Sequence, residues 1–205
     1  MKIVIATNNK NKVKEISEIL KIEGLELLSL DNFNIPETIE DKETFRDNAL
    51  KKAREVFEYT NILSIADDSG LEVDCINGQP GVYSARFSGE KATSEQNNSK
   101  LLEMLKDIPQ DKRTARFRCS LALVGKDFEI VTDGVCEGFI LQELKGDKGF
   151  GYDPLFFYPP LGLTFAELSK EEKNKVSHRA KSFEKMKEFI DFILFNRLNR
   201  KEEKR

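Results

Sequence analysis

The chain has few histidines and cysteines and no large excess of either charge. Its 205 residues include one histidine and three cysteines, and 33 basic residues stand against 36 acidic ones, for a net charge of −3. A single histidine excludes a metal centre built from several imidazoles. The near balance of charge gives no global reason to expect a stable nucleic-acid partner or binding to a membrane surface.

Cysteine pairs and long apolar runs are also missing. Cys75, Cys119 and Cys136 are widely separated, without a C-x-x-C pair, so they do not resemble a zinc site. Cys119 falls on the apolar side of a strand pattern, which is typical of a reduced core thiol. No run approaches the ~20 apolar residues of a membrane span, and residues 1–6 are too short for a signal-peptide core. We therefore expect a soluble, cytoplasmic protein with no membrane partner.

The chain begins with a strand, a polar turn and a helix, but the turn has neither the Walker A nor the Rossmann glycine pattern. Residues 2–6 are apolar, residues 7–12 are polar, and Val13, Ile16 and Leu20 recur at helical spacing. The first N–H groups of a helix are unpaired and carry partial positive charge, which suits phosphate. Taken alone, the segment favours a simple capped helix with a solvated lysine.

Two carboxylates, Asp67 and Asp68, follow the apolar run at residues 62–66 and precede Ser69 and Gly70. This pattern predicts a buried strand that ends in a turn stabilised by an aspartate. Because successive strand residues point to opposite faces, both aspartates serve one site only if the chain turns between them. We expect one to be the chemical carboxylate and the other to hold the turn.

A further acid, Glu40, lies in the loop before the next helix. Thr44 and Asp47 resemble a capping box at the start of that helix, whose apolar face runs from Phe45 to Val56. An acid at this position can also act only on the helix dipole. The sequence leaves these two explanations open.

Two glycine-rich segments, residues 77–89 and 146–153, are candidates for ligand contact. In the first, Arg86 lies between Tyr83 and Phe87, where it can bind a phosphate or stack on a ring as a surface residue. In the second, glycines allow close backbone approach, and neighbouring aromatic rings suit a planar base. The alternative for the second segment is a tight turn before an apolar strand.

The C-terminal part contains two helix caps. Ser169 and Glu172 form a capping box, and Ser177 precedes the longest helical pattern. His178 and Arg179 occupy the first turn of that helix, where each cation destabilises the helix by ~0.3–1 kcal/mol. Such a local violation is expected where an anion or a polar ligand compensates for it.

Strand patterns in the middle of the chain predict a mixed sheet. They cover residues 115–123, residues 128–131 after a turn, and residues 135–144 with an interruption at Gly138. Helical segments lie before and after them, so we expect an α/β fold with helices divided between the faces or ends of the sheet. We find no repeat or long linker, which favours a single domain over residues 1–205.

Five motifs, in order along the chain, resemble the inosine triphosphate pyrophosphatase family. The resemblance runs from Ile3 to about Phe189. The motifs are Thr7-x-Asn9-x-x-Lys12, residues 66–74, residues 80–87, residues 149–154 and residues 168–180.

The resemblance implies a fold and an activity. The fold is an elongated central mixed β-sheet whose helices form two lobes around a substrate cleft, usually in a homodimer. The activity is Mg²⁺-dependent hydrolysis of ITP, dITP and XTP to the nucleoside monophosphate and pyrophosphate. This reaction removes non-standard purine nucleotides before they enter DNA or RNA.

The resemblance also implies roles for residues. Asp68 would bind the metal and activate water as the general base, and Glu40 would be the second metal carboxylate. From the alternation of strand faces we then expect Asp67 to be the residue that holds the turn. The chain reads Glu40-Asp41-Lys42 where the family usually has Glu-Thr-Gly, which leaves open whether Asp41 competes for the ion. The residues expected to bind substrate are Thr7, Asn8, Asn9, Lys10, Asn11, Lys12, Ser69, Arg86, Phe150, Gly151, Tyr152, Asp153, Lys173, His178 and Arg179.

Hydrogen-bond chemistry predicts which purines the site accepts. Inosine and xanthosine carry a 6-oxo acceptor where adenosine carries an amino donor. Donors such as Lys173, His178 or Arg179 would be left unpaired by ATP, a mismatch worth roughly 10⁴-fold in discrimination. Two alternatives remain: a pyrophosphatase for modified pyrimidine or methylated nucleotides, and a non-catalytic sensor of purine triphosphates.

Overall fold

The computed structural model describes residues 1–36 and 38–202, with side chains through residue 196, and shows an α/β protein with one mixed sheet. The sheet order is β2-β1-β3-β4-β5-β6-β7. The strands are β1 (Lys2–Ile5), β2 (Glu26–Ser29), β3 (Ser64–Val73), β4 (Thr114–Gly125), β5 (Phe128–Ile140), β6 (Phe156–Tyr158) and β7 (Leu163–Thr164). The α-helices are α1 (Lys10–Ile19), α2 (Phe45–Thr60), α3 (Ser94–Leu105), α4 (Lys170–Val176) and α5 (His178–Glu202).

Both strand orientations occur in this sheet. β1 pairs in parallel with β2 and with β3, whereas β6 is antiparallel to both β5 and β7. Only two residues separate β4 from β5, which are neighbours in the sheet, so these strands form the predicted hairpin. The predicted mixed α/β sheet is therefore confirmed.

The chain divides into two compact units, each with its own core. Unit 1 comprises Met1–Asp68, Ser120–Asp133 and the chain from Ala180 on, and unit 2 comprises Ser69–Cys119 and Gly134–Arg179. The division falls within β3, β4 and β5, so each of these strands contributes residues to both units.

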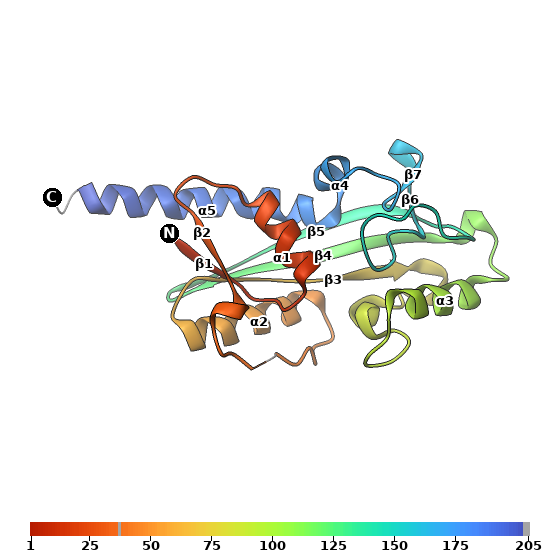
Figure 1. Cartoon of the computed structure of the whole chain (residues 1–205), viewed down its shortest axis with the longest axis horizontal. Coiled ribbons are helices and arrows are strands. Elements are labelled where there is room, and N and C mark those ends of the chain that lie inside the picture. The colour runs from red at the N-terminus through yellow and green to blue at the C-terminus, as the bar shows by residue number, and fades with distance from the viewer. Residues whose placement is uncertain (37, 203–205) are drawn as a thin grey trace. The chain divides into compact units, whose positions relative to one another are not determined.

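In unit 1 the strand residues alternate between two apolar layers. Odd-numbered residues of β1 and β3 pack with α1 and α5, and even-numbered residues pack with α2. Figure 1 shows α1 and α5 on one side of these strands and α2 on the other. By the same alternation, Asp67 points to the side of α1 and Asp68 to the side of α2.

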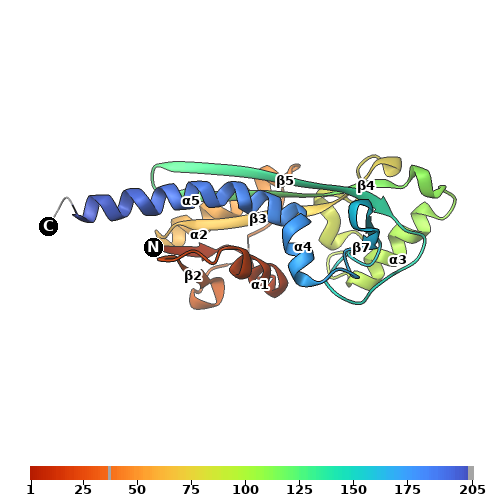
Figure 2. The same cartoon turned by 90° about the horizontal axis from the view of Figure 1, so that it is seen from above.

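The hairpin of unit 1 supports the long C-terminal helix. α5 runs alongside β5 in both Figure 1 and Figure 2. The Thr132 hydroxyl donates to the Ser182 carbonyl at 2.9 Å, and the Ser182 hydroxyl donates to the Thr132 carbonyl at 2.8 Å. These buried bonds join β5 to α5, which begins directly after the predicted cap at Ser177.

Aromatic rings dominate the core of unit 2. The Phe117 ring lies 4.6 Å from that of Phe156 and 5.7 Å from that of Phe165, measured between centroids. The buried Tyr152 and leucines of α3 belong to the same core.

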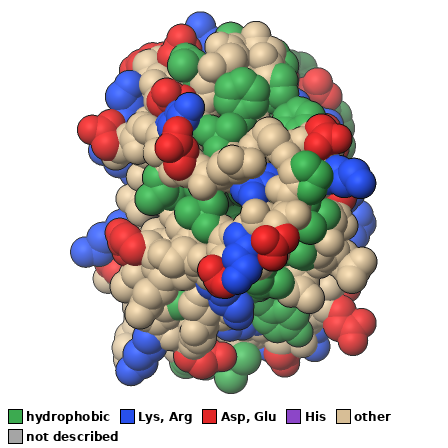
Figure 3. Space-filling view, turned by 90° about the vertical axis from the view of Figure 1, so that its right-hand side faces the viewer, with side chains coloured by type: hydrophobic (Ala, Val, Ile, Leu, Met, Phe, Trp, Pro, Cys, Tyr) green, Lys and Arg blue, Asp and Glu red, His purple; other side chains and the backbone are tan. Residues whose placement is uncertain are grey.

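On the molecular face in Figure 3, acidic and basic side chains are interspersed, in keeping with the small net charge.

Two predictions about strand ends are wrong. The chain does not turn at Asp67 and Asp68, because β3 continues from Ser64 to Val73. β1 pairs with β3 only at Ser64 and Ile65, so the neighbour of the later residues is β4, and pairing in the sheet overrides the weak strand propensity of Asp, Ser and Gly.

Likewise, Gly138 does not interrupt a strand. β5 is continuous from Phe128 to Ile140, and it ends before the predicted limit at residue 144. A Cβ atom at Gly138 would lie 2.4 Å from the Phe157 carbonyl oxygen. Glycine here permits β5 and β6 to approach closely, which is a known use of glycine inside a strand.

The structure tests the expected state of the cysteines. Cys75, Cys119 and Cys136 are free thiols, and Cys119 is buried as predicted. Within residues 1–36 and 38–202, no helix has the length and apolarity needed to cross a bilayer.

Candidate active site

The predicted polar turn after β1 caps α1. The Asn9 side chain accepts from the backbone N–H groups of Asn11 and Lys12 at 3.0 and 3.2 Å, and Thr7 Oγ1 accepts from the Asn9 N–H at 3.2 Å. Asn9 is therefore the N-cap, as expected for a helix start. Asn8, Lys10 and Asn11 are exposed at this end of α1.

Lys12 links α1 to β3. Its Nζ lies 3.1 Å from Asp67 Oδ2, and Asp67 is completely buried. The predicted role of Asp67 in holding a turn is wrong, since no turn occurs there. Its carboxylate instead pairs with a lysine from the candidate phosphate-binding helix start.

Asn48 and Lys52 place two polar groups on the buried face of α2. Both residues are buried among Phe45, Ala49 and Ala53. The Asn48 amide donates from Nδ2 to Asp68 Oδ2 at 3.1 Å. Neither residue was predicted from the sequence, although their position on the apolar stripe of α2 is a signal that polar groups are buried there.

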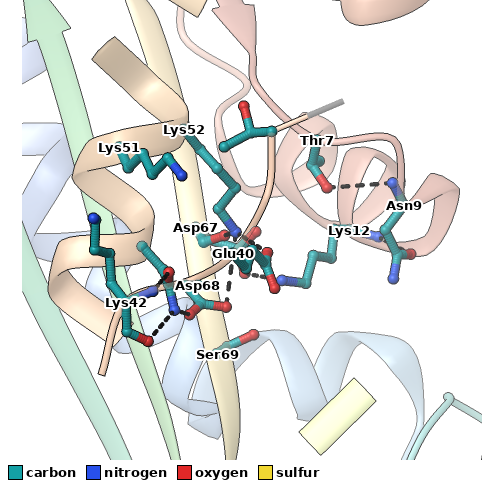
Figure 4. A network of polar contacts seen from close by, with 12 residues as sticks. Thr7, Asn9, Lys12, Glu40, Lys42, Lys51, Lys52, Asp67, Asp68 and Ser69 are labelled. Carbon is teal, nitrogen blue, oxygen red and sulfur yellow. Dashed lines mark hydrogen bonds and ion pairs between the residues drawn. The ribbon is translucent and has the colours of Figure 1, made fainter. Parts of the chain in front are cut away.

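The Lys52 ammonium lies at the centre of a cluster of acidic groups. It donates to Glu40 Oε1 at 2.6 Å and to the Asp67 carbonyl at 2.6 Å, and it lies 3.7 Å from Asp68 Oδ1. Figure 4 shows Lys52 reaching from α2 toward Glu40, which lies on the preceding loop. We call Lys12, Glu40, Asn48, Lys52, Asp67 and Asp68 the carboxylate–lysine cluster.

Burial and charge act in opposite directions on the pKa values in this cluster. Burial by itself would lower the pKa of Lys52, but the negative charges of Asp68, Glu40 and Asp67 outweigh it and raise that pKa. Burial raises the pKa of Asp68, and Lys52 and Lys12 oppose this only in part. Lys52 therefore remains a cation beside a carboxylate that holds a proton more readily than an exposed aspartate.

The acid next to Glu40 has different partners. Asp41 is exposed, and its Oδ1 lies 2.9 Å from Lys51 Nζ and 3.5 Å from Lys42 Nζ. The hydrogen bond from Lys51 lowers the pKa of Asp41 despite the small opposing effect of desolvation. This geometry favours Glu40 over Asp41 as the acid of the cluster.

Unit 2 contains a second set of predicted residues. Arg179 is 2% exposed, donates from Nη2 to Ser69 Oγ at 3.0 Å, and has its guanidinium 5.8 Å from the centroid of the Phe150 ring. Lys173 Nζ lies 4.9 Å from the same centroid and 2.6 Å from Asp153 Oδ2. We call Ser69, Phe150, Asp153, Lys173 and Arg179 the aromatic–cation cluster.

Asp153 organises the glycine loop of this cluster. Its Oδ2 accepts from the Phe150 N–H at 2.8 Å, and Gly149 and Gly151 have positive φ angles of 75° and 63°. A Cβ atom at Gly149 would lie 2.1 Å from Asp153 Oδ2. The loop conformation therefore requires glycine, and it presents the half-buried Phe150 beside two cations.

Other predicted substrate residues in unit 2 have structural contacts. The buried Tyr152 hydroxyl donates to the Ser84 carbonyl at 2.9 Å, and burial raises the pKa of Tyr152. The His178 ring stacks on Phe117 with the centroids 4.7 Å apart. The Arg86 guanidinium lies 5.1 Å from the centroid of the Tyr83 ring, the stacked arrangement that was one of its two predicted alternatives.

Buried carboxylates beside lysines and a helix N-terminus are typical of sites for phosphorylated ligands and divalent cations. The fold and these clusters thus define an α/β protein with a candidate phosphate–metal site. The chain belongs to the Ham1 family, whose model matches residues 3–189. This match confirms the family predicted from the five motifs.

Relatives and solved structures agree with this membership. The chain is 54% identical over 193 residues to the dITP/XTP pyrophosphatase of Desulforamulus reducens, covering 93% of this chain and 96% of that protein. It is 47% identical to the dITP/XTP pyrophosphatase of Clostridium perfringens, covering 94% and 98%. The structure of a HAM1 protein from Coxiella burnetii matches with a TM-score of 0.87 and 36% identity, covering 93% of this chain and 98% of that one.

Proposed function

We propose that this protein is a nucleoside triphosphate pyrophosphatase for non-standard purines. It hydrolyses ITP, dITP and XTP to the nucleoside monophosphate and pyrophosphate, which keeps these nucleotides out of DNA and RNA. The observation that carries the proposal is the buried carboxylate–lysine cluster in a chain of the Ham1 family. Relatives named dITP/XTP pyrophosphatase support the substrate class.

The residues of unit 1 fit a magnesium ion. Glu40 and Asp68 offer hard oxygen ligands that Lys52 already brings together, 2.6 and 3.7 Å from its ammonium. Among the residues that the structure describes, no group of three or more His, Cys, Asp or Glu side chains is placed to hold an ion. Two carboxylates suit Mg²⁺, which keeps several waters and takes further ligands from substrate phosphates. When bound, Mg²⁺ would neutralise phosphate charge and lower the pKa of a bound water.

The chain's own groups provide the remaining chemistry. Lys12 and Lys52 bind phosphate oxygens and stabilise the charge that develops as the phosphoanhydride bond breaks, and the partial positive charge at the N-terminus of α1 adds to this. Asp68 accepts a proton from the attacking water, and its raised pKa brings it nearer to the range of an effective general base. Asp67 holds Lys12 in place for this task through their 3.1 Å ion pair.

The aromatic–cation cluster selects the base. The Phe150 ring offers a face for stacking, and Lys173 and Arg179 offer donors to the 6-oxo group of hypoxanthine or xanthine. The amino group of adenine cannot accept these bonds, so ATP does not gain them. Asp68 and Ser69 are consecutive residues, so one strand carries a member of each cluster.

A substrate panel tests this proposal directly. Pyrophosphate release is measured with Mg²⁺ from dITP, XTP, GTP, ATP, dUTP and a methylated pyrimidine triphosphate. We expect dITP and XTP to react fastest, and Asp68→Asn to lower kcat by roughly 10²–10⁴-fold. Preference for ATP or for a pyrimidine, or full activity of the variant, would overturn the proposal.

Two further parts of the proposal concern the state of the protein in the cell. The homodimer that the resemblance implies and the cytoplasmic location expected from the sequence stay predictions. Sedimentation velocity of the purified chain decides the first, since a monomer at micromolar concentration contradicts it. Fractionation of the source cells decides the second.

A further inference from the structure

Asn48 is a completely buried residue of the carboxylate–lysine cluster. Its side-chain amide bonds both to the loop that carries Glu40 and to Asp68 on β3. Its Oδ1 accepts from the Lys42 N–H at 3.0 Å, and its Nδ2 donates to the Lys42 carbonyl at 3.2 Å. The same Nδ2 donates to Asp68 Oδ2 at 3.1 Å. A primary amide has two N–H donors, and here both have acceptors.

These bonds connect elements that lie far apart in the sequence. Lys42 follows Glu40 by two residues, so the amide fixes the loop that carries this acid. Asp68 comes from β3, whose backbone is held by the sheet. Figure 4 shows Asp68 next to the chain at Lys42. Asn48 thus sets the loop with Glu40 against the strand with Asp68.

The contact also fixes the orientation of the Asp68 carboxylate. Oδ2 is held by the Asn48 amide, while Oδ1 lies 3.7 Å from Lys52 Nζ. With one oxygen held on each side, rotation of the carboxylate about its own axis is restricted. A catalytic group that is displaced by 1 Å can lose about 10²-fold in rate.

No other residue of similar size supplies the same bonds. Aspartate keeps an acceptor for the Lys42 N–H, but it has no donor when ionised and adds a negative charge beside Asp68. Alanine leaves the Lys42 backbone groups and Asp68 Oδ2 without this partner. The amide itself is therefore required, rather than its volume.

We propose that Asn48 is a positioning residue that aligns Asp68 and the Glu40 loop for hydrolysis. The proposal rests on the proposed pyrophosphatase function, because Asp68 is its general base. It predicts an effect mainly on kcat, since the side-chain amide of Asn48 bonds to the Lys42 backbone and to Asp68, the proposed general base.

The test compares Asn48→Ala and Asn48→Asp with wild type, using kcat and KM for dITP. We expect both variants to lose roughly 10²-fold in kcat, with KM changed by less than about threefold. Asn48→Asp keeps the shape of the side chain. A decrease in kcat in this variant is therefore caused by the missing hydrogen bond to Asp68 and not by altered packing. In the Asp68→Asn background, Asn48→Ala should cause little further loss, because both changes act on one group.

Hydrogen exchange provides a readout without turnover. Asn48→Ala should accelerate exchange of the Lys42 amide, whereas Asn48→Asp should protect it better, because its carboxylate can still accept from this N–H. Thr132→Val is the matched control: it removes a buried hydrogen bond of unit 1 at constant shape, outside the cluster. The control should change neither kcat nor exchange at Lys42.

The outcomes are distinguishable. Wild-type kcat in both Asn48 variants, or additive losses with Asp68→Asn, overturns the positioning role and leaves the proposed function standing. An inactive wild type overturns the proposed function and the catalytic role of Asn48 with it. Unchanged exchange at Lys42 in Asn48→Ala overturns the link to the Glu40 loop in either case.

Discussion

At the scale of single residues, Asp67 and Asp68 are chain neighbours with different partners. The Asp67 carboxylate faces Lys12 on α1, and the Asp68 carboxylate faces Asn48 and Lys52 on α2. The alternation of strand side chains causes this division without any turn between them. Lys52 nevertheless lies near both residues, 2.6 Å from the Asp67 carbonyl oxygen and 3.7 Å from Asp68 Oδ1, so both acids can belong to one site without a turn.

Exchanging either acid for its amide should separate the role of Asp67 in phosphate binding from that of Asp68 in water activation. We expect Asp68→Asn to lower kcat by roughly 10²-fold or more. Asp67→Asn removes the partner of Lys12 and should raise KM for dITP more than it lowers kcat. Steady-state kinetics on both variants, with folding checked by circular dichroism, decides this. Loss of turnover in folded Asp67→Asn beside an active Asp68→Asn would contradict the assignment.

Lys52 balances the buried acids, so its removal should affect stability as well as catalysis. Lys52→Met leaves Glu40 and Asp68 without their shared cation, and breaking a buried pair in this way costs roughly 3–5 kcal/mol. Lys52→Arg is the control, because it keeps the charge and should retain more stability. The measurement is the free energy of unfolding in urea.

The decrease in the free energy of unfolding caused by Lys52→Met should also depend on pH. The pKa of Asp68 is already raised, chiefly by burial, and removing Lys52 raises it further. A carboxyl group with a raised folded-state pKa favours the fold below its unfolded pKa, and this contribution is lost as pH rises through the folded pKa. The variant should therefore be closer to wild type at about pH 5 than at about pH 8. An equal deficit at both pH values contradicts this electrostatic explanation.

At the scale of elements, neighbouring strands decide conformations that local propensity disfavours. Asp67, Asp68, Ser69 and Gly70 form the middle of β3, although these residue types are depleted in strands. Two glycines are required because a side chain would not fit. Gly138 allows β5 to approach β6, and Gly149 allows the Asp153 side chain to close its loop.

Substitution of Gly138 should test the close approach of β5 and β6. Gly138→Ala places a Cβ atom 2.4 Å from the Phe157 carbonyl oxygen, and such overpacking typically costs about 1–3 kcal/mol. In Gly24→Ala, by contrast, the new Cβ meets no atom within 4 Å but the backbone has a φ of +79°. Thermal unfolding should show that Gly138→Ala is the more destabilised of the two. The reverse order would rule out the steric explanation.

At the scale of the whole molecule, the chain combines two cores of different character. Unit 1 has two mainly aliphatic layers on opposite faces of its strands, and unit 2 has a core rich in aromatic rings. The groups with candidate chemical roles are divided in the same way. The acids and lysines of the proposed metal and phosphate site belong to unit 1. The Phe150 ring and the cations of the proposed base site, Lys173 and Arg179, belong to unit 2.

Metal removal should affect turnover and ligand stabilisation but not the fold. We expect chelation by EDTA to abolish dITP hydrolysis and leave the circular dichroism spectrum unchanged, because Lys52 balances the acids without the ion. With Mg²⁺, a non-hydrolysable dITP analogue at 100 times its Kd should add about 2.7 kcal/mol of stability.

Glu40→Gln should need more Mg²⁺ for half-maximal activity, whereas Asp41→Asn should behave as wild type. The opposite pattern would identify Asp41 as the ligand.

Most elements and the family were predictable from the sequence alone. Helix caps are local, so Asn9, Thr44, Ser169 and Ser177 marked helix starts that the structure confirms. The apolar periodicity of α2 and the alternation at the start of β4 depend only on neighbouring residues, and both are confirmed. The order of the five motifs was sufficient to identify the family.

Only the tertiary structure decided how the acids are used. Whether Asp67 and Asp68 lie in a turn or in a strand depends on pairing with β4, which is distant in sequence. The roles of Asn48 and Lys52 depend on the packing of α2 against β3, which brings residues 48 and 52 to residues 67 and 68. Local patterns specify which elements form, but long-range packing sets which polar groups meet and which pKa values shift.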